Sequence, residues 1–228
     1  MNTLEEFKNK CNKITEMFKA DECVDGVIDP ESYFNQKTKL LWVLKEANSE
    51  ESFSFIECFN DPKWLEKCGS SLASIRRVIY TSYGILDSEN REWKEFPWSN
   101  DILCQEKLKS IAYINIKKKS GGSFSIDAEI AAAYIENQII LKEQIETYNP
   151  DIIIFGNTIS YINKSDFEGL ENAKPVITEY GNHYYIIDKK LYIHTWHPAV
   201  RGKGFNDKDY VMDIVNITRK FKNKITNI

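Results

Sequence analysis

Four short segments hold the side chains with the greatest capacity for chemistry. They are residues 45–49, 115–122, 156–160 and 195–201. The first contains a carboxylate and a carboxamide, Glu46 and Asn48, and the last contains His197 beside a rigid proline. Carboxylates and carboxamides can orient water and stabilise a cation, whereas a histidine can donate to an oxygen that gains negative charge. These residue types favour hydrolysis of a bond that breaks with charge separation.

Each segment lies at the end of a stretch that predicts a buried strand. These stretches are residues 39–44, 110–116, 151–156, and the pair 184–187 and 191–195, which forms a hairpin or two consecutive short strands. Their continuous apolar character is typical of strands covered on both faces. Helices are expected between them, so the pattern predicts a mostly parallel sheet with its ligand site at the carboxyl ends of the strands.

Helical patterns separate these strands. Thr3 and Glu6 occupy capping-box positions at the start of an amphipathic stretch over residues 3–18. Further helices are expected over residues 72–83, from a cap at Asp127 to the Asn-Pro at 149–150, and over residues 207–221. The predicted fold is α/β: a three-layer α/β/α sandwich with a short, mostly parallel central sheet, in a single domain over residues 1–228.

Length and composition limit the class of protein. The 228 residues are 42% hydrophobic and 28% charged, and no apolar run approaches the ~20 residues of a membrane span. The acidic start of the chain differs from a secretory signal, so we expect a cytoplasmic monomer without membrane association. A net charge of -4 gives no overall attraction to nucleic acid, so any such contact needs a local patch.

No cofactor is expected. The five cysteines include no Cys-x-x-Cys pair, which argues against a disulfide framework, a zinc site and an iron–sulfur cluster. His194 and His197 are three residues apart, so on a strand they face opposite sides, and no acid or thiol partner is evident. The fingerprints of dinucleotide oxidoreductases, P-loop ATPases, serine hydrolases and zincins are also missing.

The segments, in this order, resemble the motifs of the uracil-DNA glycosylase superfamily. Residues 45–49, Lys-Glu-Ala-Asn-Ser, are similar to its first motif of the Gly-Glu-Ala-Pro-Gly type, and residues 113–118 to its asparagine-containing second strand. Residues 149–156 resemble its pre-helix strand, and residues 197–199, His-Pro-Ala, resemble its final His-Pro-Ser.

This resemblance implies a DNA glycosylase that hydrolyses the N-glycosidic bond of a flipped uracil or modified pyrimidine and leaves an abasic site. The implied catalytic residues are Glu46, Asn48 and His197, with either of the first two activating water. The implied base-binding residues are Asn115, Phe55, Phe53 and Lys45. The implied DNA-binding residues are Lys117, Lys118, Lys119, Ser123, Arg201 and Lys203. A carboxamide both donates to and accepts from a base edge, and an aromatic ring offers a stacking surface.

Departures from the motifs bear on the substrate and leave alternatives open. Lys45 and Ser49 replace glycines, and Asn48 stands where proline is common. This more polar loop favours a modified pyrimidine, such as a glucosylated hydroxymethylcytosine of phage DNA. The first alternative is a non-catalytic module that keeps the fold and binds nucleic acid or a protein. The second is a hydrolase of free nucleosides, which would not need the lysine run or Arg201.

Overall fold

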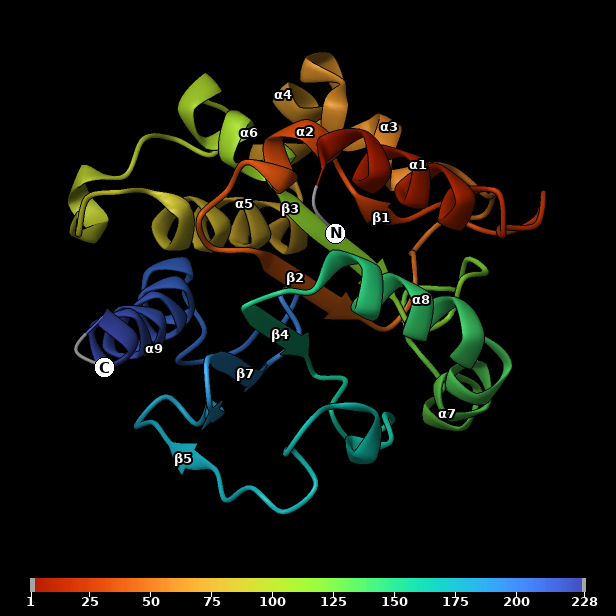
Figure 1. Ribbon diagram of the computed structural model, residues 1–228. Helices are drawn as coiled ribbons and strands as arrows, with labels where there is room; N and C mark the ends of the chain where they lie inside the picture. Colours follow the sequence, from red (N-terminus) through yellow and green to blue (C-terminus); the bar gives the residue numbers. More distant parts are fainter. Residues whose placement is uncertain (1–2, 227–228) are drawn as a thin grey trace.

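The apolar stretches form the middle of a seven-stranded sheet in the computed structural model, which describes residues 3–226 (Figure 1). The strands are β1 (Gly26–Val27), β2 (Leu40–Leu44), β3 (Ile111–Asn115), β4 (Ile152–Gly156), β5 (Val176–Ile177), β6 (His183–Ile187) and β7 (Lys190–Thr195). Their order across the sheet is β1-β3-β2-β4-β7-β6-β5. All five predicted strands are therefore present, as β2, β3, β4, β6 and β7, and the last two of the chain form a hairpin.

The sheet is mixed in direction. β2 pairs in parallel with β3 and β4, and β4 pairs in parallel with β7, whereas β1–β3, β6–β7 and β5–β6 are antiparallel pairs. The prediction of a short, mostly parallel sheet is therefore wrong. The hairpin adds antiparallel pairing at one side, and two-residue strands extend both edges. The central strands β3, β2, β4 and β7 still end at the same edge of the sheet.

Helices cover both faces of this sheet, as in an α/β/α sandwich. They are α1 (Leu4–Thr15), α2 (Pro30–Phe34), α3 (Phe55–Asn60), α4 (Pro62–Ser71), α5 (Ala73–Leu86), α6 (Ile102–Lys109), α7 (Asp127–Glu136), α8 (Gln138–Tyr148) and α9 (Asp207–Thr226). Thr3 caps α1 as predicted, since its hydroxyl accepts from the Glu6 N–H at 3.2 Å. The long helix expected after Asp127 is broken at Asn137 into α7 and α8.

Alternation along the strands divides the core into two layers. Leu40, Trp42 and Leu44 point to one face, where they pack with α5, α6 and α9. Leu41 and Val43 point to the other face, where α1, α7 and α8 cover them. Figure 1 shows α5 and α9 on one side of the central strands and α8 on the other. Because each central strand is buried on both faces, only its ends are available for chemistry.

None of the described helices is long and apolar enough to cross a membrane. All five cysteines are free thiols. Within residues 3–226, no cluster of three or more histidine, cysteine or acidic side chains is placed to hold a metal ion.

Candidate active site

The loops after β2 and β3 run side by side at the carboxyl edge of the sheet. Leu44 and Asn115 are partners in the parallel register, so both strands end at the same level. Beyond them the Gly121 N–H donates to the Ala47 carbonyl at 2.8 Å, and Asn48 forms a parallel bridge with Gly121. The predicted first and second motifs are therefore neighbours in space.

The His-Pro turn after β7 reaches the same edge. A side chain added at Gly156 would place its Cβ 3.1 Å from Pro198 Cδ and 2.3 Å from Leu44 Cδ2, so only glycine lets these groups meet. The charge of Lys45 acts on the His197 imidazole, where it adds to the effect of burial. The structure thus brings five of the predicted residues to one edge: Lys45, Glu46, Asn48, Asn115 and His197.

Glu46 links the loop after β2 to the loop after β3 through a buried side chain. Its side chain is 4% exposed, and its Oε2 lies 2.9 Å from the Lys117 ammonium, which also contacts Glu129 of α7 at 2.7 Å. The carboxylate presses against the backbone of Gly121, where an added Cβ would come within 2.0 Å of Oε2. Glu46 is therefore a buried clamp between the two loops and α7. Asn48, on the same loop, is exposed and free to meet water or a substrate.

Two adjacent glycines test this clamp. Gly121→Ala is expected to lower the free energy of unfolding by about 1–3 kcal/mol, because the new methyl group overpacks the Glu46 carboxylate. Gly122→Ala is the matched control, since no atom lies within 4 Å of its added Cβ, and it should change stability by less than about 0.5 kcal/mol. Urea unfolding measures both values. Equal changes in the free energy of unfolding for the two substitutions would contradict the close packing of Glu46 against Gly121.

Asn115 carries a buried carboxamide that the protein does not use. Its backbone N–H donates to Asp25 Oδ2 at 2.8 Å, and its side chain is 1% exposed. Neither Oδ1 nor Nδ2 has a hydrogen-bond partner among the described residues. Such groups each cost about 1–3 kcal/mol, so a pair of them at the end of a central strand points to a ligand.

His197 is held as a neutral hydrogen-bond donor. Its Nδ1 accepts from the Ala199 N–H at 3.1 Å. Burial, assisted by the nearby Lys45 cation, lowers the pKa of His197 to about 4. The imidazole is therefore uncharged at neutral pH, and since Nδ1 is an acceptor, the ring proton resides on Nε2. That proton can be donated to an oxygen of a bound ligand.

Lys45 is restrained by the same edge. Its ammonium lies 3.4 Å from Asp127 Oδ1 and 5.0 Å from the centre of the Tyr161 ring, and its side chain is 12% exposed. Asp127 is the first residue of α7 and does not cap it through its side chain, contrary to the prediction. Its carboxylate instead joins the end of the β3–α7 loop to Lys45.

Arg77 positions the His-Pro segment, a role that was not predicted from the sequence. Its guanidinium donates to the carbonyls of Pro198 (3.0 Å), Val200 (2.8 Å) and Phe205 (3.2 Å), and pairs with Asp207 at 2.8 Å. The side chain is 4% exposed. An arginine within the apolar helix predicted over residues 72–83 could have indicated this role. A charged side chain is buried in such a helix only when other groups of the protein pair with it.

The three lysines predicted to bind phosphate are each paired with an acid of the chain, and one of them is buried. Lys118 is 1% exposed, and its ammonium contacts Asp25 at 2.8 Å and Gln144 Oε1 at 2.9 Å, so its assignment to DNA binding is wrong. Lys119 pairs with Asp21 at 2.9 Å, and Lys117 is shared by two glutamates. Acids from distant parts of the chain neutralise all three charges.

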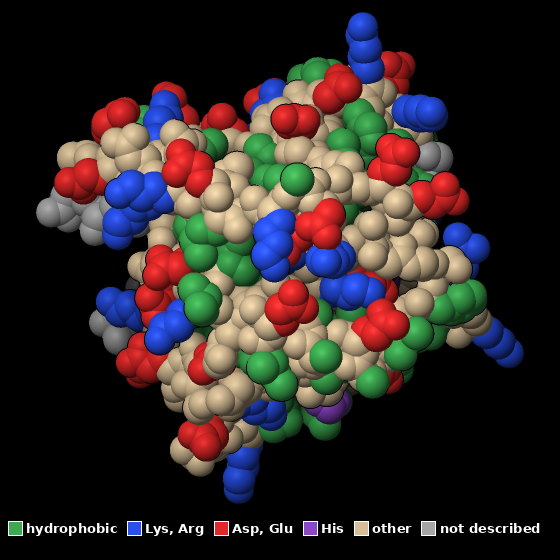
Figure 2. Space-filling model, turned by 90° about the vertical axis from the view of Figure 1, so that its right-hand side faces the viewer, with side chains coloured by type: hydrophobic (Ala, Val, Ile, Leu, Met, Phe, Trp, Pro, Cys, Tyr) green, Lys and Arg blue, Asp and Glu red, His purple; other side chains and the backbone are tan. Residues whose placement is uncertain are grey.

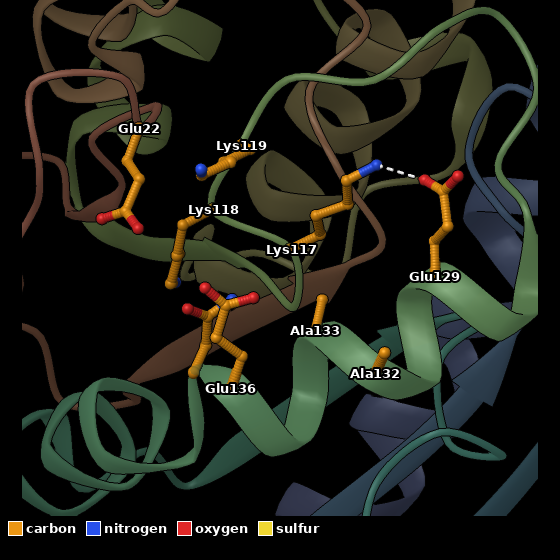
Figure 3. Close-up of a pocket in the computed structure, with 9 residues that line it drawn as sticks. Glu22, Lys117, Lys118, Lys119, Glu129, Ala132, Ala133 and Glu136 are labelled. Atoms are coloured by element: carbon orange, nitrogen blue, oxygen red, sulfur yellow. Dashed lines mark hydrogen bonds and ion pairs between the residues drawn. The ribbon is translucent and has the colours of Figure 1, made fainter.

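A pocket of about 220 Å³ lies between this lysine run and α7. Figure 3 shows the Lys117 side chain extending to Glu129 beside it. Glu22, Glu129 and Glu136 also line the pocket, and this negative charge opposes a phosphate. The pocket is therefore unsuited to hold the DNA backbone.

The predicted stacking residues are largely occupied within the core. Phe55 is 5% exposed and packs against Tyr113, with ring centres 4.8 Å apart, so its assignment as a base platform is wrong. Phe53 is half-buried against Phe55 at 4.6 Å. Phe55 is the first residue of α3, and Phe53 lies two residues before it. The helix packs against the sheet, so the Phe55 side chain points into the core.

The remaining predicted DNA contacts lie on exposed loops. Ser123 follows the two glycines of the β3–α7 loop. Arg201 and Lys203 follow the His-Pro turn, and neither forms an ion pair with another residue in the described part of the chain. Gly202 and Gly204 have φ values of +129° and +92°, which favour glycine and let this tip turn sharply. Their roles in DNA binding remain predictions.

No protein family model and no curated protein matches the chain.

Proposed function

We propose that this protein is a DNA glycosylase, related to the uracil-DNA glycosylase superfamily, that releases a flipped uracil or modified pyrimidine. The observation that carries the proposal is the unused, buried carboxamide of Asn115, located at the same edge as Asn48 and His197. The Watson–Crick edge of a pyrimidine presents donors and acceptors side by side, and a carboxamide matches that arrangement.

The reaction places different demands on the two sides of the base. The C1′–N bond breaks with its electron pair leaving on the base, so the sugar becomes cationic and the base oxygen gains negative charge. The Nε2–H of neutral His197 donates to that oxygen. Water adds through its oxygen to C1′ and loses one proton to solvent, while the released base gains one. An abasic site remains.

Asn48 is the better candidate for positioning the water. The Glu46 carboxylate is 4% exposed and paired with Lys117, so it contacts the substrate poorly, whereas Asn48 is exposed on the same loop. A carboxamide oxygen can accept from water and aim its lone pair at the sugar. Glu46 then acts as a positioning residue that fixes the loop carrying Asn48.

The proposal is tested with duplex oligonucleotides that contain uracil, a mismatched thymine or a modified cytosine. Incubation with the protein should produce an abasic site in at least one of them, detected as strand cleavage on alkali treatment. Asn48→Ala should abolish this cleavage and leave DNA affinity unchanged. Absence of alkali-labile sites with all three substrates would contradict the proposal.

His197 gives a second test with a defined pH dependence. His197→Ala should slow base release by about 10²-fold or more, the usual effect of losing one transition-state donor. Because the pKa of His197 is lowered to about 4, the imidazole stays neutral as pH falls, so the rate should show no histidine-dependent change between about pH 8 and pH 5. Single-turnover rates across this range provide the measurement. A transition near pH 6.5 that disappears in His197→Ala would contradict the assignment.

A non-catalytic DNA-binding module is the second candidate. The burial and neutralisation of Glu46 favour it, because a glycosylase of this proposed type would gain from an exposed carboxylate near the sugar. This module would bind the same oligonucleotides without producing alkali-labile sites. The cleavage assay therefore separates the two candidates.

A further inference from the structure

The β3–α7 loop, residues 117–127, is fastened at both ends to the segment after β2. Near its start, the Gly121 N–H donates to the Ala47 carbonyl at 2.8 Å. At its end, the Asp127 carboxylate lies 3.4 Å from the Lys45 ammonium. The middle of this loop is therefore held beside the candidate active site.

Phe124 stands in the middle of the loop with its ring in solvent. Its side chain is 89% exposed. It lies three residues from Gly121 and three from Asp127, so its Cα is within about 11 Å of the Cα of either anchor, given the rise of an extended chain. A phenyl ring in water is unfavourable compared with a covered one. A ring carried on a loop that is anchored at both ends is suited to a ligand with a flat apolar surface.

We propose that Phe124 is the surface on which an unpaired nucleobase of bound DNA stacks. This inference rests on the proposed function, because it takes the ligand to be DNA. A base that leaves the helix, or the one it leaves behind, loses stacking neighbours and needs a replacement. Aromatic side chains provide that replacement for any base, since every base has a π face.

The surroundings of Phe124 favour a nucleobase over a protein partner. Gly122 and Ser123 precede the ring and are exposed, so little bulk obstructs a flat ligand. Arg201 and Lys203 extend from another loop of the same edge and can contact phosphates. Figure 2 shows the side of the molecule that carries α7 and α8, where hydrophobic side chains appear in small groups among charged ones.

Phe124 also fills a role that the core aromatics leave open. Phe55 is buried against Tyr113, and Phe53 is half-buried against Phe55. Phe55 cannot turn its face to a base without leaving the core, and Phe53 has only part of its surface outside it. The β3–α7 loop, in contrast, already presents an aromatic ring outside the core.

The test measures the affinity for DNA by fluorescence anisotropy, using labelled single-stranded and duplex oligonucleotides. Phe124→Ala should weaken binding by about 5- to 100-fold, the range expected for one lost base stack, and Phe124→Trp should restore it. Ile135→Ala is the matched control, because Ile135 is another largely exposed apolar residue, at 75% exposure on α7, and this variant should bind DNA as the wild type does. The loss from Phe124→Ala should persist as salt rises, whereas the loss from Arg201→Ala should shrink.

The outcomes separate this inference from the proposed function. Phe124-dependent DNA binding without any alkali-labile product would support the stacking role and contradict the glycosylase. Normal base release with equal DNA affinity of the wild type and Phe124→Ala would overturn the stacking role alone. A change of oligomeric state in Phe124→Ala at unchanged DNA affinity, measured by sedimentation, would overturn it in favour of a protein interface. Failure of the wild type to bind either oligonucleotide would overturn both.

Discussion

An Asn115→Leu variant is expected to be more stable than the wild-type protein and unable to release a base. The carboxamide of Asn115 is buried, and both of its polar atoms lack a partner among the described residues. Leucine has a similar shape without this cost, so the free energy of unfolding should rise by about 1 kcal/mol or more. Base release should fall by about 10³-fold or more, because a site built to hydrogen-bond its ligand loses that recognition.

Another buried asparagine provides the control for this prediction. Asn137 is 9% exposed, and its Nδ2 donates to the Ile116 carbonyl at 3.0 Å. Asn137→Leu should therefore be destabilising, since it removes a bond that the fold uses and leaves a carbonyl unsatisfied. Urea unfolding measures both variants, and the alkali cleavage assay measures base release. Destabilisation of Asn115→Leu to the same extent as Asn137→Leu would show that the Asn115 carboxamide is structural.

A Lys118→Met variant is expected to lose about 3–5 kcal/mol of stability. The ammonium of Lys118 compensates the Asp25 carboxylate, which is completely buried, and removing one member of such a pair leaves an isolated charge. Burial raises the pKa of Asp25 and lowers that of Lys118, so each charge persists because the other is present. Asp25 also accepts the Asn115 N–H, so the loss should extend to the candidate active site.

A double substitution distinguishes the ion pair from simple packing. Asp25→Asn with Lys118→Met removes both charges and keeps the approximate volume, so it should be more stable than Lys118→Met alone. Urea unfolding of the single and double variants gives the coupling free energy. Additive losses would contradict the pairing. Lys119→Met is the surface control and should change stability by less than about 0.5 kcal/mol, because its partner Asp21 is exposed.

The central strands could be predicted because their apolar character is local and continuous. Residues 39–44 and 151–156 have no polar face, and both became strands of the sheet. The antiparallel edge strands β1 and β5 could not be predicted, because they have only two residues each and leave no pattern in the sequence, whereas the β6–β7 hairpin was one of the two predicted arrangements. The break of the long helix at Asn137 could not be predicted either, because apolar residues continue on both sides of it and indicate one uninterrupted helix.

The candidate site could be predicted only in part. The rule that parallel strands end at one edge of the sheet placed Asn115 and the turn with His197 at the same edge, because it depends on chain order. Contacts between distant residues are outside that rule. Lys118 lies in a stretch without local acids, and its neutralisation by Asp25 is visible only after folding. Arg77 bonds to segments more than a hundred positions away, as the separations of its hydrogen bonds show.

The hydrogen bonds of Arg77 determine how the chain after β7 can move. One guanidinium fixes the carbonyls of Pro198, Val200 and Phe205, so residues 201–204 form a short tip between the last two anchors, closed by a 3.2 Å hydrogen bond from the Phe205 N–H to the Gly202 carbonyl. Gly202 and Gly204 give this short tip its backbone freedom. The Arg201 side chain can therefore change direction while the hydrogen bonds of Arg77 keep the turn that carries His197 in place. The connection between β7 and α9 therefore contains a fixed part, which holds His197, and a separate adjustable part, which holds Arg201.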